Sequence, residues 1–422
     1  MSGRGLIAAA VTLGLAVPLA QPAAPADRQP FRPCPTVKVP APADRPPRPS
    51  PPAADPDRPV IGGPRLQTPG LVTAPSTPTP PALTATSWVV ADLDSGAVLG
   101  GCGPHVLTTP ASVQKLLLAA TMLPKLNPAR KVEVNRADLE IEPGSSAVGL
   151  LLGGEYAVET LWLGLLLNSG NDAANVLARL GGGDAGAKGG VAAMNVEARR
   201  LGAYDTTAVT PSGLDGRGQF TSAYDLALIA RVCFARDDFS EYVATERTQI
   251  PAQPPKDPRG FQIQNDNQLL FNYPGALGGK TGFTDLARHS FVGAAERDGR
   301  RLVVTLLGAE AAPLRAWQQA AELLDWGFAL PADASVGDLV TPEQIEAQQR
   351  AAAEVAAPKA QAVPGPQWAP RGGQLLLAGW SYVAVTGLVA VLALVMLAVA
   401  VRSARRRRGY RRGRRRVARS RA

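Results

Sequence analysis

The stretch Thr109-Pro110-Ala111-Ser112-Val113-Gln114-Lys115-Leu116-Leu117-Leu118 places a serine and a lysine three residues apart. The proline and the apolar run after Lys115 predict a helix over residues 111–123 that starts near Ser112. Residues three apart share one face of a helix, so the amine of Lys115 would reach the hydroxyl of Ser112. A serine needs a nearby base to become a nucleophile, and a lysine serves when its pKa falls. An isolated pair of this kind is also typical of a solvated helix start.

Two further polar motifs follow in the chain. Ser169-Gly170-Asn171 comes after the amphipathic run Leu161–Leu167, and a hydroxyl beside an amide can relay a proton and hold a substrate amide. Lys280-Thr281-Gly282 follows two glycines, which would let a substrate backbone lie close to a strand edge. Its lysine and threonine offer a cation and a hydroxyl to a carboxylate. Each motif alone could equally be a polar break between helices or a loop lysine before a turn.

The order of the elements indicates the fold class. Two apolar strands over residues 88–99 surround a turn at 94–96, and further strands are expected at 288–295 and 301–308. Helices are expected at 157–180, 222–235 and 314–324. Strands at both ends around a helical middle predict an α+β domain over residues 87–330. Its antiparallel sheet, closed by remote segments, would be flanked by helices and carry a helical subdomain.

The charge of the chain is concentrated in its tail. Twelve arginines and no acids lie between Arg402 and Arg421. Their positive charge exceeds the formal net charge of the whole chain, +9, so residues 1–401 carry a small net negative charge. We therefore expect no nucleic-acid binding by the body of the protein. With two histidines and three scattered cysteines, we also expect no metal site and no cofactor.

Taken together, the three motifs resemble the S-x-x-K, S-x-N and K-T-G signature of penicillin-binding proteins and serine β-lactamases. The closer similarity is to the low-molecular-mass D-alanyl-D-alanine carboxypeptidases, and it covers about residues 87–330. It rests on five stretches: VADLDSG from Val90, LLNSGNDAA from Leu166, TPSGLD from Thr210, TSAYDLA from Thr221 and GGKTGFTD from Gly278.

The resemblance implies a β-lactamase/D,D-peptidase fold and a role for each motif. Ser112 would attack the bond between two D-alanines of a peptidoglycan pentapeptide and form an acyl-enzyme that water hydrolyses. Lys115 would be the base, with Ser169, Asn171 and Lys280 completing the catalytic set. The amides of Ser112 and Phe283 would form the oxyanion hole, and Thr281 and Gly282 would bind substrate, assisted by a distal arginine for which Arg315 is the candidate. β-Lactam antibiotics would inhibit the enzyme.

Several rival functions stay open at this point. A β-lactamase of the same fold would need an additional glutamate that positions the deacylating water. Between Ser169 and Lys280 the sequence offers Glu197, which we expect to lie solvated on a helix. A silent wall-binding protein would have lost a motif residue, whereas all three motifs are intact. A Ser-His-Asp hydrolase would need His105 or His289, and neither lies in a G-x-S-x-G context.

The flanking segments predict an exported, membrane-tethered protein. Residues 1–26 have the pattern of a signal peptide, and residues 27–86 form a proline-rich spacer that we expect to be disordered. A second linker is expected at 331–373. Residues 375–401 contain no charge over 27 residues, enough for a transmembrane helix, and the arginine-rich tail 402–422 would lie in the cytoplasm and meet lipid. The catalytic domain would then lie outside the cell membrane.

The cysteines permit one disulfide. Cys233 lies in an apolar helix and is expected to be a buried, inert thiol. We hypothesise a Cys34–Cys102 disulfide, which would fix the spacer to the catalytic domain in an oxidising compartment. The alternative is that Cys34 pairs with another chain or stays reduced.

Overall fold

The computed structural model describes residues 31–40, 45–53 and 59–356. Its centre is an antiparallel sheet in the order β1-β3-β2-β10-β9-β8, with β11 paired to β3. The strands are β1 Leu71–Thr73, β2 Ser87–Asp92, β3 Ala97–Cys102, β8 Ala276–Thr284, β9 Arg288–Arg297, β10 Arg300–Ala309 and β11 Gly337–Asp338. Segments more than 170 positions apart in sequence therefore meet in one sheet, as β2 does with β10.

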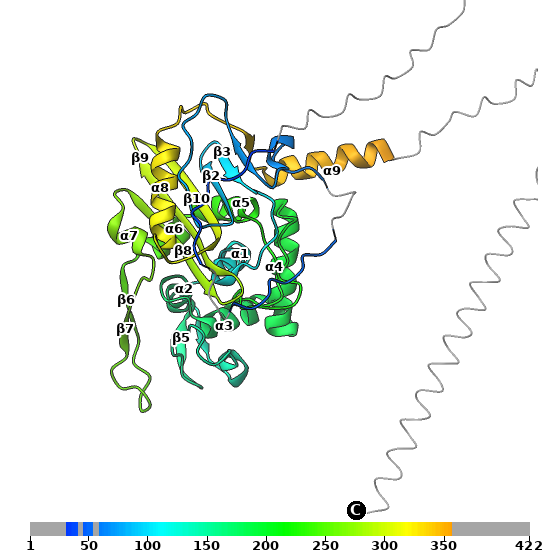
Figure 1. Ribbon diagram of the computed structural model, residues 1–422. Coiled ribbons are helices and arrows are strands. Elements are labelled where there is room, and N and C mark those ends of the chain that lie inside the picture. The colour runs from blue at the N-terminus through cyan, green and yellow to red at the C-terminus, as the bar shows by residue number, and fades with distance from the viewer. Residues whose placement is uncertain (1–30, 41–44, 54–58, 357–422) are drawn as a thin grey trace, which may run out of the picture. The chain divides into compact units, whose positions relative to one another are not determined.

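Both faces of the sheet are covered by helices. Helix α8 (Ala316–Phe328) packs on one face and α5 (Ala223–Phe234) on the other (Figure 1). Side chains of a strand alternate between the two faces, so Trp88 and Val90 join the core under α8, while Val89 and Ala91 join the core toward α5. This explains why β2 is buried along its whole length.

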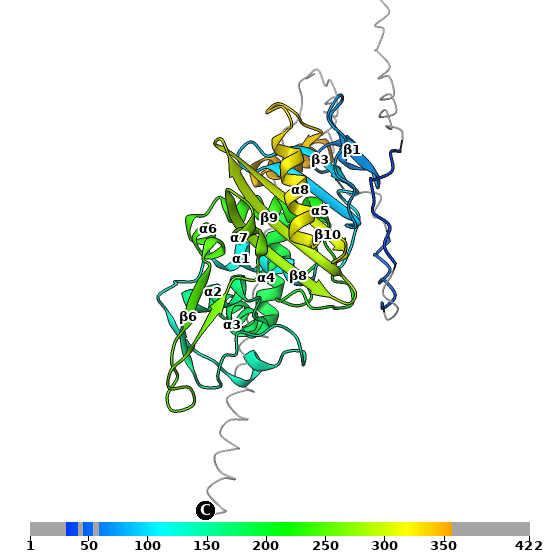
Figure 2. The same ribbon diagram turned by 60° about the vertical axis from the view of Figure 1, so that its left-hand side comes forward.

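The other helices form a subdomain beside the sheet (Figures 1 and 2). They are α1 Lys115–Met122, α2 Val158–Leu167, α3 Asn171–Gly181, α4 Gly186–Leu201 and α6 Asp237–Ala244, with the small pairs β4 Lys131–Glu133 with β5 Glu155–Ala157 and β6 Arg247–Ile250 with β7 Phe261–Gln264. Short helices are η1 Pro64–Leu66, η2 Ala111–Gln114, η3 Arg136–Leu139, η4 Gly183–Ala185 and α7 Gln268–Asn272, and α9 Pro342–Ala356 closes the described chain. The α+β class and the helical subdomain are as expected from the sequence.

One predicted helix is divided in two. Residues 157–180 were expected to be continuous, but α2 ends at Leu167 and α3 begins at Asn171. Ser169, between them, has the left-handed φ of 61°, a conformation that an α-helix cannot contain. The break falls on the Ser169-Gly170-Asn171 motif.

The ordered domain also extends beyond the expected limits 87–330. In the predicted spacer, β1 pairs with β3, and Leu66, Leu71, Val72 and Leu83 are buried in the core. In the predicted linker, β11 pairs with β3 and α9 follows it. The expectation of disorder over 27–86 and of a plain linker over 331–373 was wrong for these segments, because a few apolar residues among many prolines are enough to bind a segment to an existing sheet edge.

The cysteine hypothesis is confirmed. Cys34 and Cys102 form a disulfide with their Cα atoms 5.8 Å apart, and Cys233 is a buried free thiol whose pKa is raised by burial. Next to the disulfide, Leu71 donates a backbone hydrogen bond to Arg32 (2.7 Å). The disulfide thus attaches the chain around residue 34 to strand β3.

Within the described ranges, no helix has both the length and the apolar character that crossing a bilayer requires. The predicted transmembrane span 375–401, the tail 402–422 and the signal peptide 1–26 lie outside the described residues.

Candidate active site

Ser112 and Lys115 lie where the short helix η2 continues into α1. The chain enters this turn through Ala111, a non-glycine residue with φ of 51°, which costs on the order of 1–3 kcal/mol and sharply redirects the backbone before Ser112. Lys115 Nζ lies 2.7 Å from Ser112 Oγ. The i, i+3 spacing of the sequence therefore brings the two groups into direct contact, as predicted.

The amine of Lys115 is enclosed by polar partners from three segments. It lies 2.7 Å from Asn171 Oδ1, 3.0 Å from the carbonyl oxygen of Ser212 and 3.5 Å from Ser169 Oγ. The lysine side chain itself is fully buried, at 0% exposure. A buried amine is tolerated here because several oxygens accept hydrogen bonds from it.

The break between α2 and α3 positions the second motif. The left-handed φ of Ser169 turns its hydroxyl toward Lys115, and Asn171 begins α3 with its amide oxygen on the same amine. Gly170 is required by close packing, since a Cβ at this position would collide with the side chain of Val148. The motif is therefore a bend that delivers two polar groups to one point.

The third motif lies on β8, which ends the strand order of the sheet. A Cβ built on Gly282 would lie 2.9 Å from the amide nitrogen of Ser112, so only glycine lets the strand pass so close to η2. Lys280 is buried and donates a hydrogen bond to the Thr281 carbonyl (2.8 Å). Phe283 is 48% exposed and its ring packs on His289 (4.7 Å between centroids).

Burial lowers the pKa of both lysines of the site, and a neighbouring like charge adds to the effect at Lys115. Burial, and after it the charge of Lys280, holds the pKa of Lys115 well below the usual 10.5, while Asp172 acts in the opposite direction. Burial lowers the pKa of Lys280 to about 8, opposed by the carboxylate of Asp266. A lysine whose pKa is depressed in this way is neutral more often and can accept the proton of a hydroxyl.

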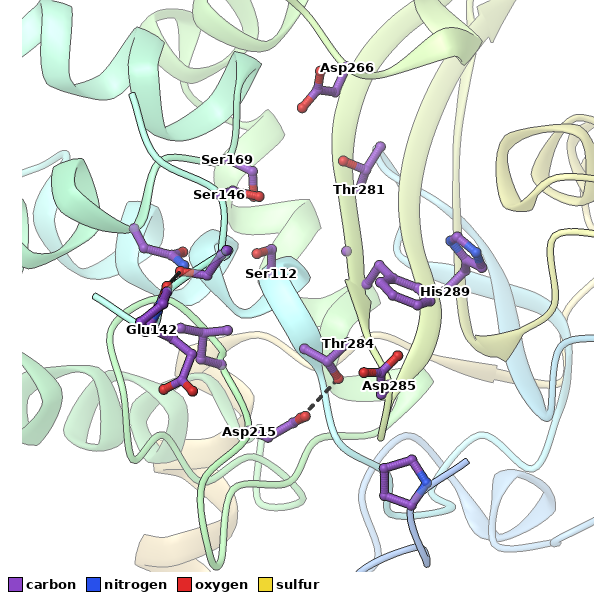
Figure 3. A pocket seen from close by; sticks show the side chains of 18 residues that line it. Ser112, Glu142, Ser146, Ser169, Asp215, Asp266, Thr281, Thr284, Asp285 and His289 are labelled. Atoms are coloured by element: carbon purple, nitrogen blue, oxygen red, sulfur yellow. Dashed lines mark hydrogen bonds between the residues drawn. The ribbon is translucent and has the colours of Figure 1, made fainter. Parts of the chain in front are cut away.

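Ser112 opens into a cavity of about 760 Å³. Figure 3 shows Ser112 at its floor, with Glu142 and Ser146 on one side and Thr281 of β8 on the other. The lining also includes Ser169, Asn171, Gly282 and Phe283, together with the acidic residues Asp215, Asp266 and Asp285. A cleft of this size accommodates an extended peptide of a few residues along the β8 edge.

Arg315 is not among the residues that line this cavity. It is an exposed residue at the start of α8, and its part in substrate binding stays a prediction. One turn later in α8, the buried side chain of Gln319 bonds to Thr84 and to the carbonyls of Glu310 and Leu314. These bonds fix the first turn of α8 with Gln319 facing inward, whereas Arg315 stays on the exposed side.

The residues on which the rival functions depend either lie outside the Ser112 cavity or make no hydrogen bond to Ser112 in the described part of the chain. His105 is hydrogen-bonded to Asp205 and lines a separate, smaller cavity, whereas His289 lines the Ser112 cavity but packs on Phe283. Glu197 lies in α4 and pairs with Arg200 of the same helix (2.6 Å). Among the described residues, the side chain that contacts the Ser112 hydroxyl is that of Lys115.

Sequence reasoning missed several contributors to the site. Asp172, Ser146 and the carbonyl of Ser212 were given no role, although Asp172 and Ser212 both lie within the stretches quoted above. Only the fold brings the loop around Ser146 against the start of α3, so no local pattern marks that serine.

Comparison with known proteins agrees with this geometry. The family model described as D-alanyl-D-alanine carboxypeptidase, of the Peptidase_S11 family, matches residues 74–311. The chain belongs to this family. It is 47% identical over 262 residues to the D-alanyl-D-alanine carboxypeptidase DacB2 of Mycobacterium tuberculosis, covering 60% of this chain and 86% of that protein. To DacD of Salmonella typhimurium it is 34% identical, covering 59% of this chain and 64% of that protein.

Solved structures show the same family relationship. A crystal structure of a D-alanyl-D-alanine carboxypeptidase from Mycobacterium tuberculosis superposes with a TM-score of 0.60 at 44% identity, covering 63% of this chain and 99% of that one. The Streptomyces K15 DD-transpeptidase superposes with a TM-score of 0.57 at 28% identity, covering 60% of this chain and 100% of that one. The protein is therefore a serine-type D-alanyl-D-alanine carboxypeptidase by family, with the expected fold.

Proposed function

We propose that this carboxypeptidase removes the terminal D-alanine of peptidoglycan stem peptides, with Ser112 as the nucleophile and Lys115 as the general base. The observation that carries the assignment is the buried amine of Lys115, 2.7 Å from Ser112 Oγ and 2.7 Å from Asn171 Oδ1. Both neighbours hold the amine in place, and its depressed pKa leaves a lone pair free for a proton.

The proposed reaction has two steps. In the first, the Ser112 hydroxyl gives its proton to Lys115, Oγ bonds to the carbonyl carbon, and the peptide C–N bond breaks. The departing D-alanine amine takes up the proton through Lys115 and Ser169. In the second step, water attacks the ester carbonyl, the bond to Oγ breaks, and Ser112 recovers its proton.

Substrate would lie along the β8 edge. The backbone amides of Ser112 and Phe283 are proposed to hold the carbonyl oxygen as it gains negative charge, supported by the close approach of Gly282 to the Ser112 amide. Thr281 and the cation of Lys280 would hold the terminal carboxylate. Arg315 stays the candidate for the distal arginine that would assist this contact.

β-Lactams would acylate Ser112 through the same contacts. The β-lactamase alternative finds weak support, because the glutamate that lines the cavity, Glu142, is exposed on a loop that precedes Ser169 in the chain. Slow hydrolysis of the penicilloyl ester is therefore expected, rather than rapid turnover.

We also propose that the domain is exported and tethered to the cell membrane. The support is the sequence alone: the apolar run Leu6–Ala20, the uncharged stretch 375–401 and the twelve arginines that follow it. The cytoplasmic tail would then contact anionic lipid. The Cys34–Cys102 disulfide suits an oxidising compartment outside the cytoplasm.

The test uses the full-length protein in detergent. It is mixed with a pentapeptide ending in D-Ala-D-Ala, with the same peptide ending in D-Ala-L-Ala as the control, and released alanine is measured. A second sample is incubated with a fluorescent penicillin, and the labelled peptide is located by mass spectrometry. We expect D-alanine release and an adduct on Ser112. An adduct on another serine, or no release from the D,D-peptide, would contradict the proposal.

A further inference from the structure

We infer that Asp172 is a positioning residue that fixes the cleft wall opposite β8, beside the Asn171 that holds Lys115. This inference rests on the proposed function of Ser112 and Lys115. It assigns to Asp172 two effects on the same reaction, one geometric and one electrostatic.

The geometric effect comes from an unusual set of hydrogen bonds. The carboxylate of Asp172, in the first turn of α3, is 2% exposed and accepts from the backbone amides of Val148 (2.9 Å), Gly149 (2.9 Å) and Leu150 (3.0 Å), as well as from Ala173 (2.9 Å). Three successive amides of one loop thus bond to a single side chain. A buried carboxylate satisfied by four N–H donors is a strong anchor for the segment that supplies them.

The anchored loop is a wall of the active-site cavity. Residues 142–146, just before the three amides, line the cavity, and Figure 3 shows Glu142 and Ser146 facing Thr281 across it. A second bond fixes the same loop to the same helix, because the amide of Asn171 donates to the carbonyl of Ser146 (2.9 Å). Asn171 also contacts Lys115 through its side chain, so the wall and the general base share one support.

The electrostatic effect follows from the sign of the charge. Burial and the charge of Lys280 lower the pKa of Lys115, whereas the carboxylate of Asp172 raises it. Removing the negative charge would lower that pKa further. At low pH the acylation rate falls because Lys115 is protonated and unable to act as a base; we call this fall the acid limb. In the absence of the Asp172 charge the acid limb would move to lower pH.

Asp172→Asn removes the charge and leaves one acceptor oxygen for four N–H donors, and Asp172→Glu keeps the charge while displacing the loop. Asp138→Asn is the matched control, because Asp138 is also 2% exposed, bonds to Arg179 on the same helix α3 (2.7 Å) and does not line the cavity. Its loss should affect stability without touching the base.

The experiment measures single-turnover acylation of the full-length protein by a fluorescent penicillin from pH 5 to 9.5. We expect D172N to acylate on the order of 10²-fold more slowly at its optimum, from loss of alignment, with its acid limb at lower pH than that of the wild type. D172E should acylate slowly with the wild-type limb, and D138N should keep both the rate and the limb.

Three outcomes would overturn the inference. A folded D172N with the wild-type limb would remove the electrostatic effect, and equal slowing in D138N would reduce the geometric effect to general stability. Failure of both Asp172 variants to fold would show that Asp172 serves the fold instead. Failure of the proposed function looks different, because the wild type would then not be acylated at Ser112 at all.

Discussion

The cavity around Ser112 and the smaller cavity around His105 both collect buried polar side chains, but they combine charge in opposite ways. In the first, two lysines lie close enough for the charge of one to lower the pKa of the other, and both are buried. In the second, of about 160 Å³, His105 bonds to the carboxylate of Asp205 (2.7 Å) and its ring packs on Tyr224 (4.6 Å between centroids). Asp225 of α5 joins the lining and accepts from Thr206 (2.7 Å).

The difference shows why buried polar side chains can act catalytically in one cavity and only stabilise the fold in the other. The hydrogen bond between His105 and the Asp205 carboxylate joins the segment after β3 to the loop after α4 and stabilises both. In the Ser112 cavity, burial first and the charge of Lys280 second disfavour the protonated form of Lys115, which costs stability and lowers the pKa of the amine beside the nucleophile. Strained backbone at Ala111 and Ser169 adds to the cost. Destabilised groups of this kind are typical of active sites.

The largest expected effect comes from removing the nucleophile of the first cavity. Ser112→Ala should abolish penicillin labelling and lower D-alanine release by roughly 10⁶-fold, as loss of the nucleophile does in other serine hydrolases. The measurement is fluorescence of the labelled protein after electrophoresis, with released D-alanine assayed in parallel. Labelling that survives in S112A would place the chemistry elsewhere.

The next effect concerns the base. Lys115→Ala should slow acylation by ~10²–10⁴-fold, because a positioned general base contributes about that much. The rate is measured by stopped-flow with the same penicillin, and circular dichroism verifies that the variant is folded. A well-folded K115A that acylates at the wild-type rate would show that the amine beside Ser112 is not the base.

The third effect tests whether the charge of Lys280 lowers the pKa of Lys115. Lys280 has a pKa of about 8, so it is charged below that pH and lowers the pKa of Lys115 there. Lys280→Met removes this charge, the pKa of Lys115 rises, and the acid limb of acylation should move to higher pH. Rates at saturating penicillin across pH 5 to 9.5 give the limb. A shift to lower pH, or none, would contradict the interaction between the two lysines.

The smallest effect on activity is expected from a substitution in the second cavity. His105→Ala leaves the Asp205 carboxylate without one of its bonds, so the free energy of unfolding should fall by about 1–3 kcal/mol. Acylation of Ser112 should stay within about twofold of the wild type, since His105 lines a different cavity. Chemical denaturation and the labelling rate are the two measurements. A large loss of acylation in folded H105A would mean that the cavities are coupled.

Much of the site could be predicted locally because its motifs are short. Ser112 and Lys115 are joined by helix geometry alone. The polar residues 169–171 allowed either a break between helices or a position within the helix expected at 157–180, and only the structure decides for the break. The apolar run Trp88–Ala91 indicated a strand without indicating which residues covered each face. Arg315 was the candidate for the distal arginine that the resemblance implies, and sequence does not say which side of the first turn of its helix faces the cleft.

The sequence by itself determined the α+β class, the three motifs and the family resemblance, since each of these depends on residues whose order carries the information. The tertiary structure alone decided that residues 64–85 and 337–345 belong to the domain, because their few apolar side chains are stabilised only by sheet and helices from elsewhere in the chain. It also decided the charge state of Lys115, which depends on burial and on the distance to Lys280 and Asp172. Burial and distance between remote residues are properties of the folded chain, and no window of sequence contains them.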